Sequence, residues 1–260
     1  MKRIFLLVLA LIMALSLTAC GGNNEKKEKP YKVSHAHIYP KSDPLYFSLE
    51  EYTLTVKGDS GELLWSDTCE TELDGVSCTE VYVSKLLGSV EEEDGGVVFT
   101  VTGGSYYVRL EGENAEEYRE KMIAWHNELI AELDPSDSYS YEYQKQSYEN
   151  SIKLYSGEEI EANDEDLEYF VNEPISFSLD GNSMITEIRI GEDGDYTFVY
   201  GEDGRLLKSV EGYLSDGTKY EAEYREDGTP FAFRYVDEDG ETTEFYCGED
   251  GTVRPVTGES

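Results

Sequence analysis

The feature that most restricts the fold of this chain is a short turn signal that recurs along its C-terminal part. The tripeptide (Ser/Glu)-Asp-Gly ends at Gly194, Gly204, Gly217, Gly228, Gly240 and Gly251, at spacings of 10, 13, 11, 12 and 11 residues. Glycine supplies the positive φ that tight turns need, and aspartate tolerates the neighbouring position. Turns this close together leave room for strands of about four to six residues. The spacing therefore predicts an antiparallel β-meander of hairpin repeats.

The stretches between these turns alternate between aromatic and polar residues. One side of each stretch carries the larger rings, as in Tyr220, Ala222 and Tyr224, and in Phe231, Phe233 and Tyr235. If Phe231, Phe233 and Tyr235 were exposed, their rings would form a ligand platform on which a sugar could stack. An exposed aromatic face would also exceed the few hundred Å² of apolar patch that soluble monomers tolerate. We therefore predict that this face packs inward.

One of these stretches is similar to a known repeat. The segment "YTFVYGEDGRLLKSV", residues 196–210, resembles the YD repeats of bacterial Rhs-type surface proteins, which run Tyr-x-Tyr-Asp-x-x-Gly-Arg-Leu. Tyr200, Gly204, Arg205 and Leu206 match, whereas Gly201 stands where the repeats have aspartate. The resemblance implies a string of hairpins in an extended or curled sheet, and it implies no activity.

Strand patterns also fill much of the region from Tyr31 to Asp134. The segments "YFSLEEYTLTV", "ELLW", "TEVYVSKLL", "GVVFTVT" and "SYYVRLE" are strand candidates, because they alternate or are rich in β-branched and aromatic residues. Gly103-Gly104 lies at the centre of "GVVFTVTGGSYYVRLE" and predicts a hairpin turn there.

The sequence period then changes in "NAEEYREKMIAWHNELIAEL". Apolar residues recur at spacings of three and four: Tyr118, Met122, Trp125, Leu129 and Leu133. This spacing predicts an amphipathic helix that packs through Trp125 and Leu129. Asn114, with Glu117 three residues later, predicts a capping box at its start, and Asp134-Pro135 ends it.

The N-terminus has the parts of an export signal. Lys2 and Arg3 form a basic head, and residues 4–19 are almost all apolar. As a helix this run would reach about 24 Å, short of the ~30 Å hydrocarbon core of a membrane. Leu17-Thr18-Ala19-Cys20 resembles the lipobox of bacterial lipoproteins. That resemblance implies a diacylglyceryl group on Cys20, cleavage before it, and a cell-membrane anchor on the extracytoplasmic face. An ordinary secretory signal and an uncleaved membrane helix are the alternatives.

These patterns divide the chain into five segments. They are a signal peptide (1–19), a lipidated N-terminus with a flexible tether (20–30), an α+β domain (31–134), a linker or edge strand (135–150) and a β-meander repeat domain (151–260). The segment 135–150 is assigned as a linker or edge strand because it is polar and its tyrosines alternate at 139, 141 and 143. The predicted fold class is β-rich α+β: an N-terminal antiparallel sheet with one amphipathic helix, then an antiparallel β-meander of hairpin repeats.

Charge restricts the partners of this chain. The formal net charge is −35 at pH 7, so the surface repels nucleic acid and anionic lipid heads. It suits a basic protein or a neutral glycan as partner. The 21 Tyr, 9 Phe and 2 Trp supply core material, which argues for a folded protein in spite of the charge.

Three cysteines follow Cys20. Cys69 and Cys78 bracket the turn signal Asp74-Gly75. Across such a hairpin they would lie opposite each other or up to two residues out of register, and an export setting permits a disulfide. A disulfide and two separate thiols both remain open. Cys247 is expected to be a small buried apolar residue.

Few residues indicate chemistry. His35 and His37 share one face of a strand, as a metal pair would, but two surface histidines are the simpler interpretation. His126 is expected on the solvated side of the helix. The turns "IGEDGD" and "VDEDGE" offer oxygen ligands for calcium, yet neither has the spacing of a calcium loop, and turn chemistry accounts for both. The sequence therefore predicts no catalytic residue, cofactor or metal site.

Three functional hypotheses remain. The first is a lipid-anchored extracytoplasmic lipoprotein that acts as a non-catalytic binding or interaction module. The second is a cell-envelope hydrolase of glycan or peptide, which a deep cleft with two carboxylates of raised pKa would favour. The third is a purely structural surface spacer, which a wholly buried aromatic face would favour.

Overall fold

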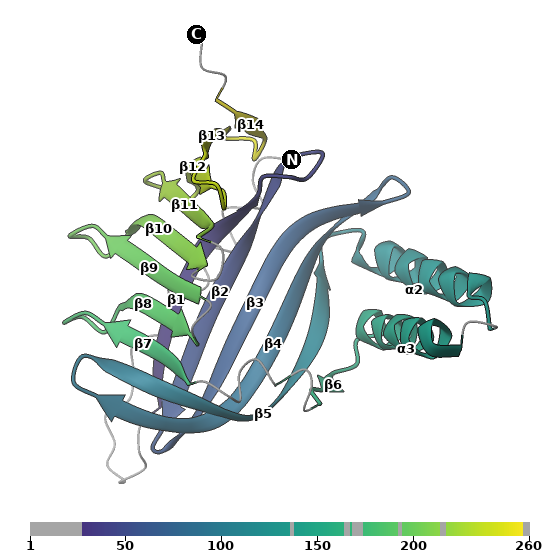
Figure 1. The fold of residues 1–260 in the computed structure, drawn as a ribbon, viewed down its shortest axis with the longest axis horizontal. Coiled ribbons are helices and arrows are strands. Elements are labelled where there is room, and N and C mark those ends of the chain that lie inside the picture. Colours follow the sequence, from purple (N-terminus) through teal and green to yellow (C-terminus); the bar gives the residue numbers. More distant parts are fainter. Residues whose placement is uncertain are drawn as a thin grey trace.

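The strands form one continuous antiparallel sheet. The computed structural model describes residues 28–135, 138–163, 167, 174–191, 194–213 and 217–256. Within these residues the sheet has 14 strands: 13 neighbour one another in chain order, and β6 pairs with β5 off this path. Two helices stand beside one end of the sheet (Figure 1). The predicted β-rich α+β class and the β-meander are confirmed.

Five long strands form the first half of the sheet. They are β1 (Lys29–Tyr39), β2 (Tyr46–Lys57), β3 (Ser60–Leu73), β4 (Val76–Glu93) and β5 (Gly96–Glu111). The predicted turn at Asp74-Gly75 is confirmed, since Leu73 pairs with Val76 across it. Both turn residues have positive φ, 50° and 76°. Two successive residues of this kind give the hairpin turn whose twist matches that of the strands.

The predicted hairpin at Gly103-Gly104 is wrong, because both glycines lie inside β5. The chain turns from β4 into β5 at Asp94-Gly95 instead. A Cβ on Gly104 would lie 2.8 Å from the carbonyl oxygen of Lys85 on the neighbouring strand. The β4–β5 register also shifts just after Leu87. Gly104 therefore permits close strand approach near a bulge, which is the other common use of glycine in strands, whereas a Cβ on Gly103 would meet no neighbouring atom within 4 Å.

Two helices follow β5, namely α2 (Ala115–Glu132) and α3 (Ser138–Tyr155). They pack on each other and against β4 and β5. The predicted amphipathic helix is confirmed as α2, but its packing face is not the predicted one. Met122 and His126 are buried, Leu129 is half-buried, and Trp125 is 44% exposed. The helix meets the sheet through positions four residues apart, so the predictions of a docked Trp125 and a solvated His126 are wrong.

The start of α2 and the segment that forms α3 also differ from prediction. Asn114 is the N-cap of α2, but its side chain makes no capping hydrogen bond and donates to the carbonyl of Ser77 instead. The predicted capping box is therefore wrong. The segment 135–150, predicted as a linker or edge strand, is helical from Ser138. Tyr148 and Tyr155 lie seven residues apart on one helix face, and both rings pack near His126.

Short strands form the second half of the sheet. They are β6 (Ile160–Glu161), β7 (Ile175–Leu179), β8 (Ile185–Ile190), β9 (Gly194–Tyr200), β10 (Leu206–Tyr213), β11 (Lys219–Tyr224), β12 (Pro230–Val236), β13 (Thr242–Cys247) and β14 (Val253–Pro255). Positive φ is confirmed at Gly204, Gly217, Gly228, Gly240 and Gly251. Gly194 differs, because it is the first residue of β9; residues 192 and 193 lie outside the described residues.

The aspartate that precedes the glycine has a defined function in several of these turns. The Oδ1 atoms of Asp203, Asp227 and Asp250 accept a hydrogen bond from the backbone N–H two residues later, at 3.1, 3.0 and 3.2 Å. Aspartate side chains commonly stabilise turns in this way. In "VDEDGE", Asp237 accepts from two backbone N–H groups. Turn geometry thus explains the acidic repeats.

The sheet curls until its second half faces its first half (Figure 1). One core lies between β1–β5 and β7–β9, and it includes Tyr52, Phe99, Ile188 and Phe198. A second core joins the end of β1 to β11–β13. Since β5 pairs directly with β7, the two regions that the sequence separates share one sheet and one core.

The aromatic face of the meander packs inward, as predicted. Phe233 and Tyr235 are 3% and 8% exposed, and Phe231 is half-buried with the guanidinium of Arg225 5.9 Å from its ring centre. The interpretation of these three rings as an exposed ligand platform is therefore wrong. They are covered because the curl brings Phe47 of β2 against Phe233, with ring centres 5.6 Å apart.

Candidate functional site

The two histidines of β1 face the interior of the curled sheet. His35 is 2% exposed, and the side chain of His37 is 11% exposed. They share one face of the strand, as the spacing predicts, but their interpretation as surface histidines is wrong. The reason is that side chains of the second half of the sheet cover this face: two rings of β9 pack on His35, and a carboxylate of β10 and a ring of β11 contact His37.

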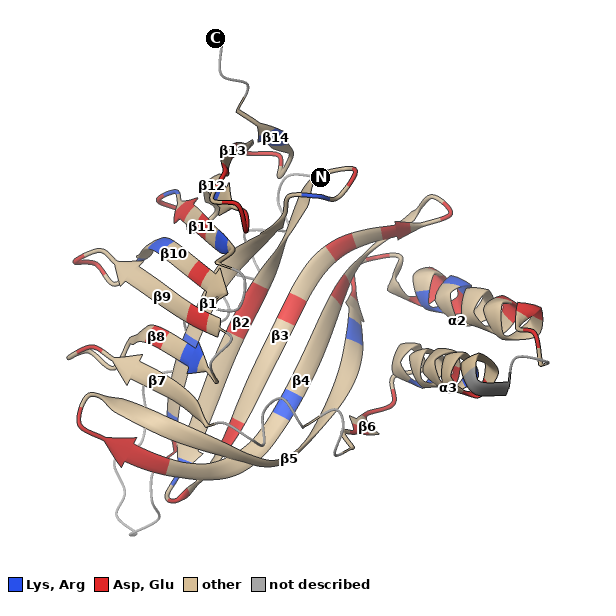
Figure 2. Cartoon of the chain, in the orientation of Figure 1, with Lys and Arg blue, Asp and Glu red and all other residues tan. Residues whose placement is uncertain are grey.

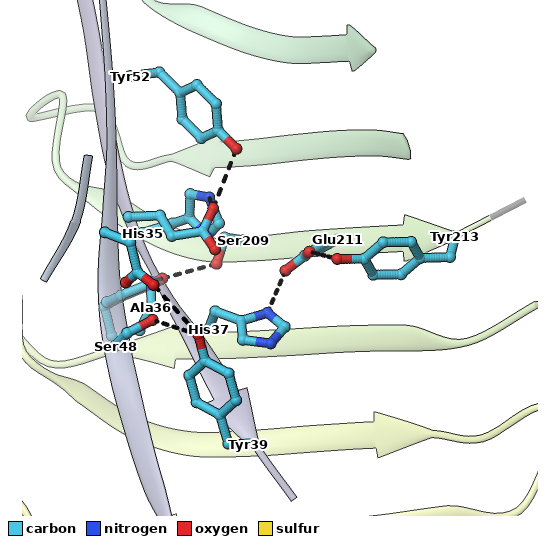
Figure 3. A network of polar contacts seen from close by, with 12 residues as sticks. His35, Ala36, His37, Tyr39, Ser48, Tyr52, Ser209, Glu211 and Tyr213 are labelled. Atoms are coloured by element: carbon cyan, nitrogen blue, oxygen red, sulfur yellow. Dashed lines mark hydrogen bonds and ion pairs between the residues drawn. The ribbon is translucent and has the colours of Figure 1, made fainter. Parts of the chain in front are cut away.

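His37 is paired with a carboxylate from the far half of the sheet (Figure 3). Its Nδ1 lies 2.6 Å from Oε2 of Glu211 on β10. Oε1 of Glu211 accepts a hydrogen bond from the hydroxyl of Tyr213 at 2.5 Å. Burial by itself lowers the pKa of His37, but the hydrogen bond and charge of Glu211 outweigh it, so the pKa is raised. Burial likewise raises the pKa of Glu211, yet His37 and Tyr213 lower it overall. Both shifts favour the imidazolium–carboxylate form of the pair.

His35 and Glu50 form a second, weaker pair beside the first. Nε2 of His35 lies 3.6 Å from Oε2 of Glu50. The imidazole stacks on Tyr52, with ring centres 5.9 Å apart, and Tyr52 donates a hydrogen bond to Glu50. Burial lowers the pKa of His35 to about 4. Burial, together with the charge of Glu211, raises the pKa of Glu50 to about 7. Both groups therefore favour their neutral forms.

Tyr224 on β11 ties the same region to the backbone of β1. Its hydroxyl accepts a hydrogen bond from the N–H of Ala36 at 2.7 Å and lies 2.7 Å from Oγ of Ser209. β1 is an edge strand of the sheet, so its outward backbone N–H groups have no ladder partner. The tyrosine supplies one such partner and closes the curl.

A shallow recess opens beside the His37–Glu211 pair. It has a volume of about 270 Å³ and is lined by Lys41, Tyr213, Thr218, Tyr220, Tyr235 and Glu238. We call it the tyrosine recess. The ring of Tyr220 lies 4.5 Å from that of His37 and 5.1 Å from that of Tyr235, between ring centres. The recess is thus the surface above the buried ion pair.

Sequence reasoning missed most of this site. Glu211 belongs to the stretch "LLKSVEGY", in which the apolar Val210 would be the expected inward residue. A register shift between Leu206 and Lys208 turns Ser209 and Glu211 inward instead. A bulge leaves no clear trace in a single sequence. The only sequence feature that pointed to this site was the pair His35 and His37. Once β1 is covered, these two polar side chains need buried hydrogen-bonding partners.

The cysteines do not form a site. Cys69 and Cys78 are both free thiols, so the disulfide that the sequence left open is absent. Cys69 lies opposite Glu80, and Cys78 lies opposite Thr71. The two cysteines are therefore diagonal neighbours, and such positions are typically ~7–8 Å apart, too far for a disulfide. Cys247 is buried, as predicted.

Comparison with known proteins gives no family. No protein-family model matches the chain, and no curated protein sequence matches it significantly. Among the residues that the structure describes, no group of three or more His, Cys, Asp or Glu side chains is arranged to hold a metal ion. Within the same ranges, no helix is long and apolar enough to cross a membrane. Cys20 and the lipobox lie outside the described residues.

Proposed function

We propose that this chain is a lipid-anchored, extracytoplasmic lipoprotein that acts as a non-catalytic binding module through the tyrosine recess. One observation carries the binding assignment. The ionisable groups of the His35–Glu50 and His37–Glu211 network are enclosed between the two halves of the sheet, whereas the recess above them presents rings and hydrogen-bonding groups. Binding needs such a surface, whereas a catalytic acid or base must also reach the reacting atoms.

The recess and the first residue of β1 lie at opposite ends of that strand. Lys29, the first residue of β1, is ion-paired with Glu92 near the β4–β5 turn. Lys41 of the recess follows the other end of β1. A strand of 11 residues spans about 35 Å at ~3.3 Å per residue. A chain anchored through Cys20 would therefore hold the recess well away from the attachment point.

The anchor is tested by Cys20→Ala. Two acyl chains give stable membrane binding and one does not, so loss of the modified cysteine should release the protein or leave an uncleaved precursor. Membrane fractionation and the mass of the N-terminus measure both. Cys247→Ala is the matched control, because it removes a buried cysteine far from the signal. A Cys20→Ala protein that is still cleaved and still firmly membrane-bound contradicts the anchor.

A cell-envelope hydrolase is the second candidate, and one observation favours it. Glu50 has a raised pKa and Glu211 a lowered one within a single network, and paired carboxylates with divided pKa values are typical of acid and base assignments. The burial of both carboxylates argues against it, since Glu50 is 8% and Glu211 3% exposed. Release of products from a glycan or peptide, lost in Glu50→Gln and in Glu211→Gln, would establish the hydrolase.

A further inference from the structure

We propose that the tyrosine recess binds one neutral sugar unit of a glycan. This inference deepens the proposed function, because it names the ligand of the binding module, and it does not depend on the anchor. Three features of the recess support it: its size, its rings and its charge.

The size of the recess suits one small ring. Its volume of about 270 Å³ falls just below the ~300–1,000 Å³ of pockets that enclose drug-sized molecules. The recess is shallow, so a ligand would be covered on one side and would continue into solvent on the other. A terminal or internal sugar unit has this form.

The rings of the recess hold one another in place. Tyr220 lies at the centre, with Tyr235, Tyr213 and His37 around it at 5.1, 6.0 and 4.5 Å between ring centres. Tyrosine offers a rigid apolar face and a polar hydroxyl, so it contributes contact area at a low cost in conformational entropy. Tyr213 and Tyr220 are half-buried and Tyr235 is buried, so the C–H face of a sugar would pack against the first two rings while its hydroxyl groups meet polar neighbours.

The ion pair beneath the recess positions these rings. Glu211 accepts hydrogen bonds from Tyr213 and His37, and the imidazole of His37 packs on Tyr220. His37 and Glu211 are thus positioning residues rather than ligand contacts. Their burial keeps the tyrosines in one arrangement before a ligand arrives, which lowers the cost of binding.

Charge favours a neutral ligand. Lys41 and Glu238 are both exposed on the rim, and their charges cancel. Acidic residues are spread over both halves of the sheet and both helices (Figure 2), and the whole chain has a formal net charge of −35. This field repels anionic ligands, and the opposite charges of Lys41 and Glu238 leave the recess without a net charge that would attract a cation. One ammonium donor and one carboxylate acceptor are also the groups that bind sugar hydroxyls.

The test is saturation-transfer NMR on the full chain. The probes are glucose, N-acetylglucosamine, maltose, cellobiose and chitobiose, each at about 10 mM, a concentration suited to weak ligands. We expect transfer to at least one of them. Tyr220→Ala should weaken its binding about tenfold, since the central ring is lost, and Glu238→Gln should weaken it severalfold.

The turns of the meander provide a matched control. Glu238 and Glu249 occupy the same position in two Glu-Asp-Gly turns, and both are exposed, but only Glu238 lines the recess. Glu249→Gln should therefore leave binding unchanged. Tyr246→Ala removes an exposed ring elsewhere on the sheet and should also leave it unchanged. Glu238 is exposed, so Glu238→Gln should leave the protein folded. This variant therefore still tests the recess if Tyr220→Ala unfolds the protein.

Each outcome decides between the claims. Absence of transfer to every probe, or equal weakening by Glu249→Gln and Glu238→Gln, overturns the sugar site and leaves the anchor untouched. Binding of an oligolysine peptide at the recess, in place of the sugars, overturns it in favour of a basic partner. Cleavage of a bound disaccharide, followed by mass spectrometry, overturns the non-catalytic function and leaves the sugar site standing.

Discussion

At the scale of single residues, the most unusual feature is a set of ionisable side chains enclosed in a β-sheet core. Glu50 faces His35 and Tyr52 on its own half of the sheet, with His37 and Asp67 also nearby, and it faces Glu211 across the curl. Buried charges are expensive unless they are paired. In one pair, His37–Glu211, the pKa shifts favour the charged forms, whereas the shifts of His35 and Glu50 favour their neutral forms.

The pH dependence of stability follows from these shifts. The pKa of Glu50 rises from 4.5 to about 7 on folding, so the folded state holds its proton more tightly. Its contribution is fully present below pH 4.5 and is lost as the pH rises through 7. The pKa of His35 falls from 6.5 to about 4, so its contribution grows as the pH rises from 4 to 6.5. The two slopes oppose each other between pH 4.5 and 6.5.

Glu50→Gln separates these two effects. The amide cannot ionise, so the free energy of unfolding of the variant, relative to the parent, should rise by about 3 kcal/mol between pH 4.5 and pH 7.5. Urea unfolding at several pH values measures it. Glu51→Gln is the control, because it removes a carboxylate ion-paired with Lys32 on the other face of the same strand. A relative stability of Glu50→Gln that does not increase with pH would refute the assignment.

At the scale of elements, the two helices are attached to the sheet by a small core and a buried carboxylate. Glu80 on β4 is 4% exposed and accepts hydrogen bonds from the hydroxyls of Tyr82 on β4 and Tyr155 on α3. Met122 of α2 packs in the same region with Tyr118, Val76 and Val108. These contacts fix which face of α2 meets the sheet.

Two substitutions on α2 measure this packing. Met122→Ala removes buried methylene groups and should lower the free energy of unfolding by about 2–5 kcal/mol. Trp125→Ala, three residues on, removes a larger but 44% exposed side chain and should cost about 1 kcal/mol or less. Thermal melting of both variants provides the comparison. A larger loss in Trp125→Ala than in Met122→Ala would mean that α2 docks through the other face.

At the scale of the whole molecule, the defining event is the closure of one sheet upon itself. β1 is held by its ladder to β2 and by side chains of β8–β11. Tyr224 joins the second half of the sheet to the backbone N–H of Ala36 across this contact. Closure creates the buried His37–Glu211 pair, the two main cores and the recess together.

Tyr224→Phe tests the closure with the loss of one oxygen atom. The N–H of Ala36 would lose its acceptor and Ser209 a partner, so the free energy of unfolding should fall by about 1–3 kcal/mol. Hydrogen exchange at the Ala36 amide should accelerate at the same time. Tyr246→Phe, at a side chain that is 52% exposed, should change neither quantity. Unchanged exchange at Ala36 in Tyr224→Phe would show that the hydroxyl does not close the curl.

The sequence by itself determined the local structure of this protein. Five of the six repeated glycines adopt the positive φ that their turns require, and the Asp74-Gly75 turn and the helix at 115–132 also form as predicted. Such features are encoded within a few residues, because backbone sterics and side-chain periodicity act locally. The same patterns explain why the chain forms a meander and why its aromatic face has to be buried.

Only the tertiary structure decided what those local elements do together. The partners His37 and Glu211 are 174 residues apart in the chain, and they meet because the sheet curls and a bulge after Leu206 turns Glu211 inward. The same closure buried His35, while the position of the sheet beside α2 left Trp125 exposed. Gly103 and Gly104 lie inside a strand, and Gly104 permits close strand approach there, for a similar reason: strand register is a property of pairs of strands. A single sequence specifies each strand, but the free energy of burial selects which strands and faces meet.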